Sequence, residues 1–299
     1  MKLIKQSFQF VNQKGFTLKD IYKHIEYCAR ISYKSQDKIT DTSYEKFVNM
    51  LESRGHDRPL EFGTVYLTLR GDDTDALRNI FIYTENPWTK IRKQVIRAEY
   101  DPNTHVVLNH VTTNYRVIVE NHLEEDLKYL CEPTEYHYKR YTVHMILDRG
   151  VMDEFRTHVG LSHLAESTRY CNYSKDKFGN ELTFIDPCWE IKTANEVVTS
   201  EGTHMSSDSL EFLTALNEAE DHYLSLLAKG WTPQQARSVL PLGIKSELIS
   251  CGFEDSWENF FRRRDAPDAH PMAQEIAKPM HEEFFKLTNG KNNEAISSC

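Results

Sequence analysis

The spacing of the hydrophobic residues along this chain changes irregularly between the two-residue period of a strand and the three- to four-residue period of a helix. The segment 3–10, LIKQSFQF, alternates as a strand does, and Ile21, Ile25 and Cys28 then recur at helical spacing behind Thr17, a good N-cap residue. Later segments switch period again without the regular alternation of a parallel βαβ protein. We therefore predict an α+β fold with a mixed sheet and packed helices.

Further elements are predicted from the same periodicity and from helix-ending glycines. Helices are expected from about residue 41 to Gly55 and over 208–229, where Gly230 ends a leucine-rich stripe, beginning with Leu210, that we interpret as core. Other strands are expected at 63–69, 105–110, 141–147 and 247–250, and other helices over 151–158, after Thr232, around Trp257 and around Glu275.

The chain of 299 residues is long enough for one large domain. It contains no internal repeat, and the polar, irregular stretch 187–208 is interpreted as a surface excursion. The predicted organisation is a single domain over residues 1–288, followed by a polar C-terminal tail over 289–299.

The net charge and the apolar runs argue against two classes of partner. Thirty-six basic and 45 acidic residues leave a net charge of -9, which disfavours a general electrostatic grip on nucleic acid polymers. No apolar run approaches the roughly 18 residues that a membrane helix needs, and the N-terminal segment lacks the apolar region of a secretion signal. We expect a cytoplasmic protein with no membrane partner.

The sequence also lacks a glycine-rich loop for phosphate. Its 12 glycines form neither GxGxxG nor GxxxxGK, so a phosphate must be held by side chains or helix N-termini. The six cysteines lie far apart without metal-binding spacing, and no motif of a serine or cysteine hydrolase is found. Neither a metal centre nor covalent catalysis is indicated.

Three polar stretches are candidates for chemistry. Within residues 156–170, Ser167 and Arg169 can offer a hydroxyl and a guanidinium to one phosphate, although a solvated helix end is the alternative. Arg237 lies among apolar neighbours, where it needs either a ligand or a structural ion pair. Arg264 is the last of three consecutive arginines, of which at most two can face one pocket.

Four motifs together resemble the flavin-dependent thymidylate synthases. They are CARISY at 28–33, GHDRPLEFGTVYLT at 55–68, STRYCNYSKDKFGNELTF at 167–184, and ARSVLP followed by FFRRRDAPDAHP. The motifs stand in the order found in the longer members of that family, and the similarity covers nearly the whole chain. The resemblance implies the α+β fold of the thymidylate synthase-complementing proteins.

The resemblance implies that the chain methylates dUMP to dTMP. Methylenetetrahydrofolate would supply the carbon, NADPH would be the reductant and FAD would carry the hydride. Because that reaction uses no cysteine nucleophile, the uracil ring must be polarised by the protein. Arg264 matches the family arginine beside the pyrimidine and is the expected catalytic residue, since its fixed charge would stabilise negative charge developing on the ring.

The resemblance also implies the binding residues and the assembly. The residues that match dUMP contacts are Glu154, Ser167, Arg169, Arg237 and Arg264. The residues that match FAD contacts are Ser32, His56, Glu61, His158 and Asn259, with Arg58 in the same loop as His56. Family members are homotetramers in which each active site draws residues from several chains, so we expect a homotetramer with shared sites.

One motif departs from the family pattern. The Arg-His-Arg signature is replaced here by Thr157, His158 and Val159. In the family those arginines help to hold flavin and nucleotide. Arg156 is adjacent, but one residue on a helix turns a side chain by about 100°, so it is no simple substitute. Arg58 is the residue expected to offset part of the loss.

Two alternatives remain open at the level of sequence. In one, the chain is a pyrimidine-nucleotide hydroxymethylase, in which water rather than hydride reaches the one-carbon adduct. In the other, it is a non-catalytic nucleotide-binding paralogue that keeps the phosphate arginines and has lost the cofactor.

Overall fold

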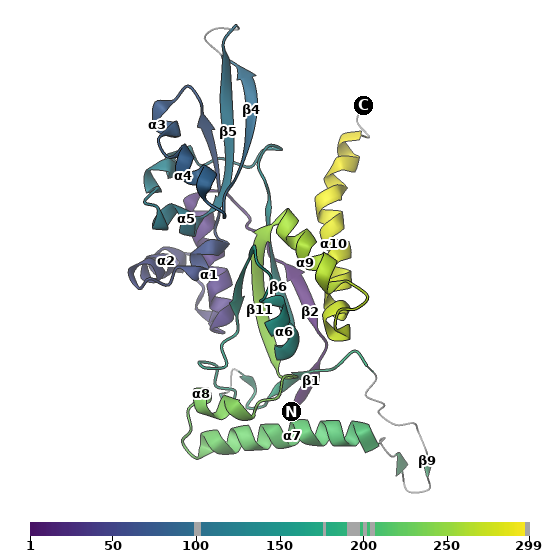
Figure 1. Cartoon of the computed structure of the whole chain (residues 1–299). Coiled ribbons are helices and arrows are strands. Elements are labelled where there is room, and N and C mark those ends of the chain that lie inside the picture. The colour runs from purple at the N-terminus through teal and green to yellow at the C-terminus, as the bar shows by residue number, and fades with distance from the viewer. Residues whose placement is uncertain (99–102, 176–177, 190–197, 200–201, 204–206, 297–299) are drawn as a thin grey trace.

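The computed structural model describes residues 1–98, 103–175, 178–189, 198–199, 202–203 and 207–296 (Figure 1). Most of the surface excursion expected at 187–208 therefore lies outside the described residues. Within them, helices and strands are mixed without βαβ alternation, which confirms the α+β prediction. None of the described helices combines the length and the apolar character needed to cross a bilayer.

A four-stranded antiparallel sheet forms the centre of the molecule, in the order β2-β6-β11-β7. The bounds are Ser7–Phe10 for β2, Arg140–Asp148 for β6, Lys245–Phe253 for β11 and Leu161–Ala165 for β7. One face packs on α9 (Glu254–Arg264) and α10 (Pro271–Ile296), and the other on α1 (Leu18–Ser32), so α1 and α10 flank the sheet in Figure 1.

The two faces follow from alternation along the strands. In β11, Leu248 packs with Trp257 of α9, whereas its neighbour Ile249 packs with Cys28 and Ile31 of α1. Since successive strand residues point to opposite faces, a strand covered on both sides must be almost continuously apolar. The polar residues that interrupt this strand are therefore informative about the site.

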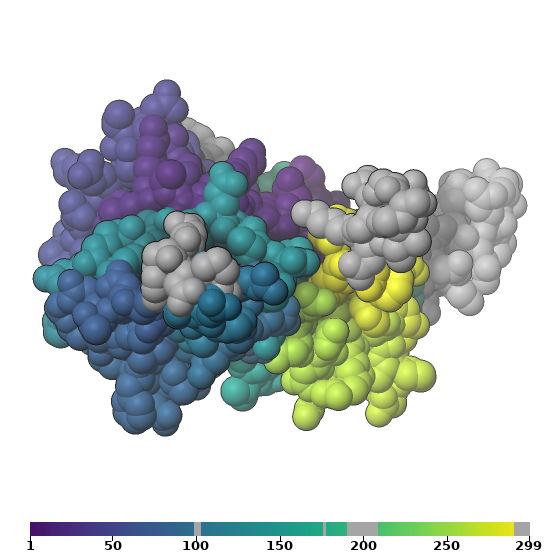
Figure 2. Space-filling view, turned by 90° about the horizontal axis from the view of Figure 1, so that it is seen from above, coloured from purple at the N-terminus to yellow at the C-terminus, as the bar shows by residue number. Residues whose placement is uncertain are grey.

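A second antiparallel sheet has the order β3-β5-β4. Its strands are β3 Thr64–Arg70, β4 Lys90–Arg97 and β5 His105–Asn114. The helices beside it are α2 Ser43–Ser53, α3 Thr74–Leu77, α4 Ile80–Glu85 and α5 Tyr115–Glu120, which share an apolar cluster with α1. Seen from above, this sheet and its helices lie on the side opposite α9 and α10 (Figure 2).

The remaining elements are short strand pairs, helices and single 3-10 turns, of which the long helix Ser207–Ala228 lies in the lower part of Figure 1. Two short pairs are β1 Lys2–Ile4 with β8 Thr183–Ile185, which are parallel, and β9 Val198–Thr199 with β10 Gly202–Thr203. The other helices are α6 Arg149–Phe155, α7 Ser207–Ala228 and α8 Pro233–Ala236, with single 3-10 turns at Gln36–Lys38, Arg58–Phe62, Glu124–Tyr129 and Arg237–Val239.

Helix boundaries expected from caps agree with the structure. Thr17 forms a capping box with Asp20 at the start of α1. Gly55 and Gly230 follow α2 and α7 with positive φ angles of 63° and 91°, as glycine-ended helices require. These signals are local, so they are read correctly without knowledge of the tertiary fold.

Three expectations differ from the structure. His158 lies beyond the end of α6, because Gly160 with φ 93° turns the chain into β7, a strand that we did not expect. Leu210 is 53% exposed rather than core, since the cluster under α7 is centred on Leu216 and Tyr223. The backbone of α10 continues to Ile296, so residues expected to form a polar tail extend this helix. The domain boundary at 288 stays a prediction.

Candidate functional site

Ser167 opens a tight turn at the C-terminal end of β7. Its backbone N–H donates to the Ser32 carbonyl at the end of α1, at 3.1 Å, and its own carbonyl accepts from the N–H groups of Tyr170 (3.1 Å) and Cys171 (2.9 Å). The turn therefore joins two residues that the family resemblance assigned to different ligands, Ser32 to FAD and Ser167 to dUMP.

Arg169 and Arg237 are brought together by reciprocal hydrogen bonds. The Arg169 Nε donates to Gln234 Oε1 at 3.1 Å, and the Arg237 Nη1 donates to Thr168 Oγ1 at 3.5 Å. We call Ser167, Thr168, Arg169, Gln234 and Arg237 the phosphate half-site. Both guanidinium groups are exposed, and within the described residues neither forms an ion pair with a carboxylate.

Unpaired cations on neighbouring segments suit an anionic ligand. A guanidinium holds phosphate through planar, charge-assisted hydrogen bonds, and it does so best where no carboxylate competes. The structural ion pair that we considered for Arg237 is not found among the described residues.

Arg264 lies in a second cluster, at the end of α9. Its Nη1 donates to Glu154 Oε2 at 2.6 Å, its Nη2 to the Glu154 carbonyl at 2.7 Å, and its Nε to His158 Nε2 at 2.8 Å. Thr157 Oγ1 accepts a longer bond from the same guanidinium, at 3.3 Å. Glu154, Thr157, His158 and Arg264 are called the Arg264 cluster below.

The charges of this cluster fix the protonation of His158. Burial lowers the pKa of His158 to about 4, and the neighbouring Arg264 and Arg263 guanidinium groups lower it as well. The ring is therefore neutral at pH 7, and Nε2 must be its unprotonated nitrogen, because it accepts from Arg264.

The phosphate half-site and the Arg264 cluster occupy opposite ends of β7. His158 precedes this strand and Ser167 follows it, and the five residues of the strand span roughly 13 Å. Of the five residues matched to dUMP contacts, Glu154 and Arg264 are at one end, and Ser167, Arg169 and Arg237 are at the other. The structure of one chain does not bring them together.

Four of the residues matched to FAD contacts have protein partners. The Ser32 hydroxyl donates to the Ala29 carbonyl at 2.7 Å, and Asn259 Oδ1 accepts from Arg262 at 2.5 Å. The Glu61 side chain is 8% exposed, and its carboxylate forms an ion pair with Arg116 at 2.5 Å. His158 belongs to the Arg264 cluster.

His56, also matched to FAD, is exposed after α2, and Arg58, expected to offset part of the lost motif charge, is exposed at the start of the 3-10 turn Arg58–Phe62. Arg58 lies close enough to the start of β7 to act on His163, whose pKa is lowered to about 4 mainly by burial and further by Arg156 and Arg58. Positive charge thus gathers near His158 and His163 although the motif arginines are missing.

The residues at the substituted motif positions, Thr157 and Val159, add no charge to this region. Val159 is 90% exposed and Thr157 binds the Glu154 carbonyl at 2.7 Å. The adjacent Arg156 forms a 3.4 Å ion pair with Asp153 and still lowers the pKa of His163. The positive charge near His163 therefore comes from Arg156 and, on a different segment, from Arg58.

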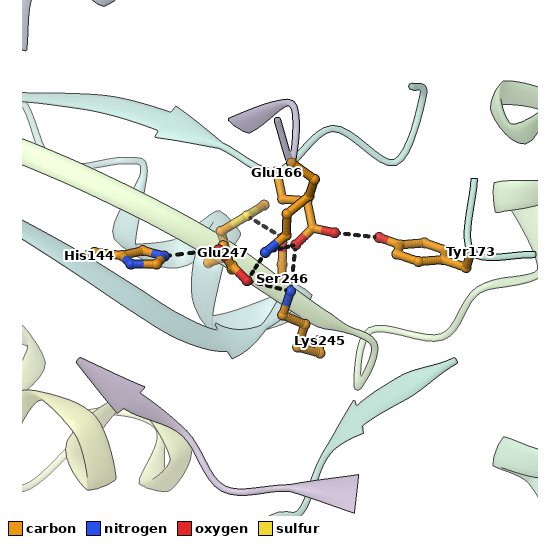
Figure 3. Close-up of polar contacts among 8 residues, drawn as sticks. His144, Glu166, Tyr173, Lys245, Ser246 and Glu247 are labelled. Atoms are coloured by element: carbon orange, nitrogen blue, oxygen red, sulfur yellow. Dashed lines mark hydrogen bonds and ion pairs between the residues drawn. The ribbon is translucent and has the colours of Figure 1, made fainter. Parts of the chain in front are cut away.

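One group of charged residues was missed in the sequence. Lys34, Glu166, Lys245 and Glu247 form a buried network beside the phosphate half-site (Figure 3). The available signal was in the segment IKSELIS, where a lysine and a glutamate two residues apart share one face of a strand that has no other charged residue.

A cavity of about 520 Å³ lies elsewhere, between β2, the loop after it and α1. Asn12, His24 and Tyr27 are among the residues that line it, and none of the residues predicted for the site does so. We therefore do not assign the predicted chemistry to this cavity.

The fold is that of an α+β protein, and of its two arginine clusters the phosphate half-site, whose arginines have no carboxylate partner among the described residues, suits an anionic ligand. Residues 107–288 match the family described as thymidylate synthase complementing protein, which is more than half of the chain. The chain belongs to this family, the flavin-dependent thymidylate synthases that its motifs resemble. Membership supports an enzyme of the thymidylate synthase type, acting in nucleotide biosynthesis.

Solved structures show a weaker similarity. The UMP/dUMP methylase PolB from Streptomyces cacaoi, bound with 5-Br dUMP or with 5-Br UMP, is 15% identical over 96% of this chain. The two alignments cover 93% and 92% of that chain, with TM-scores of 0.42 and 0.43. Similarity at this level does not extend to function. No curated protein matches the sequence.

Proposed function

We propose that this protein is a flavin-dependent thymidylate synthase that methylates dUMP to dTMP, with methylenetetrahydrofolate as carbon donor and NADPH as reductant. Family membership supports the reaction class, and the residues matched to substrate contacts support the nucleotide. The proposal depends most on the phosphate half-site, where Arg169 and Arg237 lie on bonded segments without a carboxylate partner among the described residues.

In this proposal the phosphate half-site binds the 5′ phosphate of dUMP. Arg169 and Arg237 would donate charge-assisted hydrogen bonds, and Ser167 would add a hydroxyl. Gln234 and Thr168 fix the two guanidinium groups before the ligand arrives, which reduces the ordering that binding requires.

Arg264 is the proposed catalytic residue. Its charge would stabilise the negative charge that develops on the uracil ring as C5 attacks the one-carbon unit. Glu154 and neutral His158 hold the guanidinium from two sides. Glu154, which also matches a nucleotide contact, would then lie beside the pyrimidine.

FAD, when bound, supplies the hydride that completes the methyl group. The residues proposed to hold it are His56, Arg58 and His158, together with Ser32, Glu61 and Asn259. Arg58 is exposed, and its charge contributes to the lowered pKa of His163, so it would suit a contact to the pyrophosphate and would offset part of the missing motif charge.

The proposed assembly is a homotetramer with shared active sites. Because Arg264 and the phosphate half-site lie at opposite ends of β7, we propose that the Arg264 cluster of one chain completes the half-site of another. Each chain would contribute residues 1–288 as a single domain.

A product assay tests the reaction directly. The protein is incubated with dUMP, methylenetetrahydrofolate, FAD and NADPH, and the nucleotide product is identified by mass. The mass of dTMP supports the proposal. A hydroxymethylated nucleotide would instead identify the hydroxymethylase alternative, and unchanged dUMP with tight nucleotide binding would identify the non-catalytic one.

A further inference from the structure

The buried network beside the phosphate half-site connects four segments. Lys245 Nζ contacts Glu166 Oε2 at 2.8 Å and Glu247 Oε1 at 2.7 Å, and Lys34 Nζ forms an ion pair with Glu247 and approaches Glu166 Oε2 to 3.9 Å. Figure 3 shows Lys245 of β11 joined to both Glu166 and Glu247. His144 of β6 contacts Glu247 Oε2 at 3.0 Å.

The network is balanced in charge and almost closed to solvent. The Glu166 side chain is 0% exposed, and two ammonium groups face two carboxylates. Burial and the two lysines lower the pKa of His144 to about 4, so its ring is neutral at pH 7 and donates from Nε2 to Glu247. Burial and Glu166 raise the pKa of Tyr173, which donates its phenolic proton to Glu166 at 3.0 Å.

Lys34 has an unusual backbone for a lysine. Helices α1, α2, α5 and α7 all end in the same pair of backbone hydrogen bonds, and the residue that follows the cap has positive φ. At α2 and α7 that residue is Gly55 or Gly230, but at α1 it is Lys34 with φ 51° and at α5 it is His122 with φ 54°. Glycine adopts this conformation at lower free energy, so backbone geometry does not explain Lys34.

The side chain of Lys34 explains why a lysine and not a glycine occupies this position. A glycine there would leave Glu247 and Glu166 with one ammonium fewer in a buried site, which is strongly unfavourable. At pH 7 this ammonium keeps its proton, although burial and Lys245 lower its pKa to about 8. A charged lysine therefore stands where the backbone favours glycine.

The network lies on both sides of the contact that places Ser167. Ser32, two residues before Lys34, accepts the hydrogen bond from the Ser167 N–H, and Glu166 directly precedes Ser167. The Glu166 N–H also donates to the Glu247 carbonyl at 2.7 Å. The start of the turn is thus attached to the end of α1 and to β11 through buried charges.

We propose that Lys34 and Glu166 are positioning residues: with Lys245 and Glu247 they hold the Ser167–Arg169 turn against the end of α1 and so set the geometry of the phosphate half-site. The identity of the ligand, dUMP, rests on the proposed function. The positioning of the Ser167–Arg169 turn by the buried network does not depend on it. None of the four residues needs to touch the nucleotide.

The main test replaces Lys34 by the residue that its backbone favours. In Lys34→Gly, amide hydrogen exchange of residues 167–171, corrected for intrinsic rates, should be at least tenfold faster at pH 7, and the dUMP dissociation constant should rise at least tenfold. Lys34→Arg, which keeps the charge, should recover most of both losses. Exchange around Arg264 should be unchanged.

His122→Gly is the matched control, because it makes the same backbone change at the end of α5 and its exposed side chain is outside the network. It should leave exchange at 167–171 and dUMP affinity within twofold of the unmodified protein. Glu247→Gln keeps the side-chain size while removing a charge. It should give the faster exchange at 167–171 and the weaker dUMP binding that are expected of Lys34→Gly, and it takes the place of that variant in the test if Lys34→Gly does not fold.

Two results separate this inference from the proposed function. If the unmodified protein does not bind dUMP, the proposed substrate is wrong, while the exchange measurement still tests the network. If Lys34→Gly and Glu247→Gln both exchange at 167–171 at the rate of the His122→Gly control, the positioning role is overturned whether or not dUMP binds.

Discussion

The phosphate half-site makes a quantitative prediction for Arg169→Ala. Arg169 is exposed and bonds to the neutral side chain of Gln234, so its removal should change the free energy of unfolding by no more than about 0.5 kcal/mol. A charge-assisted hydrogen bond to phosphate contributes about 1.5–3 kcal/mol to binding. The dUMP dissociation constant should therefore rise roughly 10- to 150-fold.

Calorimetric titration with two ligands measures this effect. Deoxyuridine lacks the phosphate, so its affinity should be the same in the unmodified protein and in Arg169→Ala. Arg97→Ala is the control, because Arg97 is an exposed arginine at the end of β4, away from the half-site. It should leave dUMP binding unchanged.

A double-mutant cycle extends the test to Arg237. If both guanidinium groups hold one phosphate, the effects of Arg169→Ala and Arg237→Ala on dUMP affinity should not add, because the first loss already displaces the ligand from the second contact. Equal losses of dUMP and deoxyuridine affinity, or no loss of either, would refute the assignment of the phosphate.

Two further predictions concern catalysis and acid stability. Arg264→Ala should lower turnover by about 100- to 1000-fold, as for the loss of a charge-stabilising donor. The circular dichroism spectrum should be unchanged. Turnover within threefold of that of the unmodified enzyme would contradict the catalytic role of Arg264. In the folded protein the pKa values of His144 and His163 are lowered from 6.5 to about 4. Between pH 6.5 and pH 4 the unfolded chain therefore binds more protons than the folded chain. The free energy of unfolding should fall as the pH falls through this interval, by about 3 kcal/mol for each histidine. Urea unfolding between pH 4 and 7 measures how the free energy of unfolding depends on pH. His163→Gln should make this dependence smaller. A free energy of unfolding that stays constant over this range would contradict the prediction.

The parts of the fold that sequence predicted correctly are those set by local signals. The capping box at Thr17 and the glycines at 55 and 230 determine helix ends through neighbouring backbone groups alone. The alternating apolar strands were likewise recognised, because a two-residue period needs no knowledge of the partner strand.

The strand β7 was missed because its polar residues, Ser162 and His163, are buried, and His163 finds a partner that is distant in the sequence. His163 hydrogen-bonds Ser250 of β11 at 2.8 Å, so a segment that reads as polar in sequence is buried in the sheet. This strand separates the two parts of the predicted nucleotide site, and neither its length nor its pairing could be derived from the motifs.

The candidate site was predictable by residue type and not by arrangement. Arg169 and Arg237 were identified from the sequence, but their bonds to Gln234 and Thr168 depend on how α8 packs beside the turn. Lys34 was not identified, since its importance depends on the carboxylates that β7 and β11 bring to it.

Subunit complementation tests most directly the claim that two chains build each site. Arg169→Ala keeps an intact Arg264 cluster, and Arg264→Ala keeps an intact phosphate half-site, so a mixed oligomer contains sites with both parts intact. The assay uses a dUMP concentration below the dissociation constant of the unmodified protein, at which Arg169→Ala, with its weakened dUMP binding, is almost inactive alone, as is Arg264→Ala. After subunit exchange at equal amounts, the two variants should together recover about a quarter of the unmodified activity. Activity no greater than the sum of the separate variants would show that the two clusters do not meet across chains.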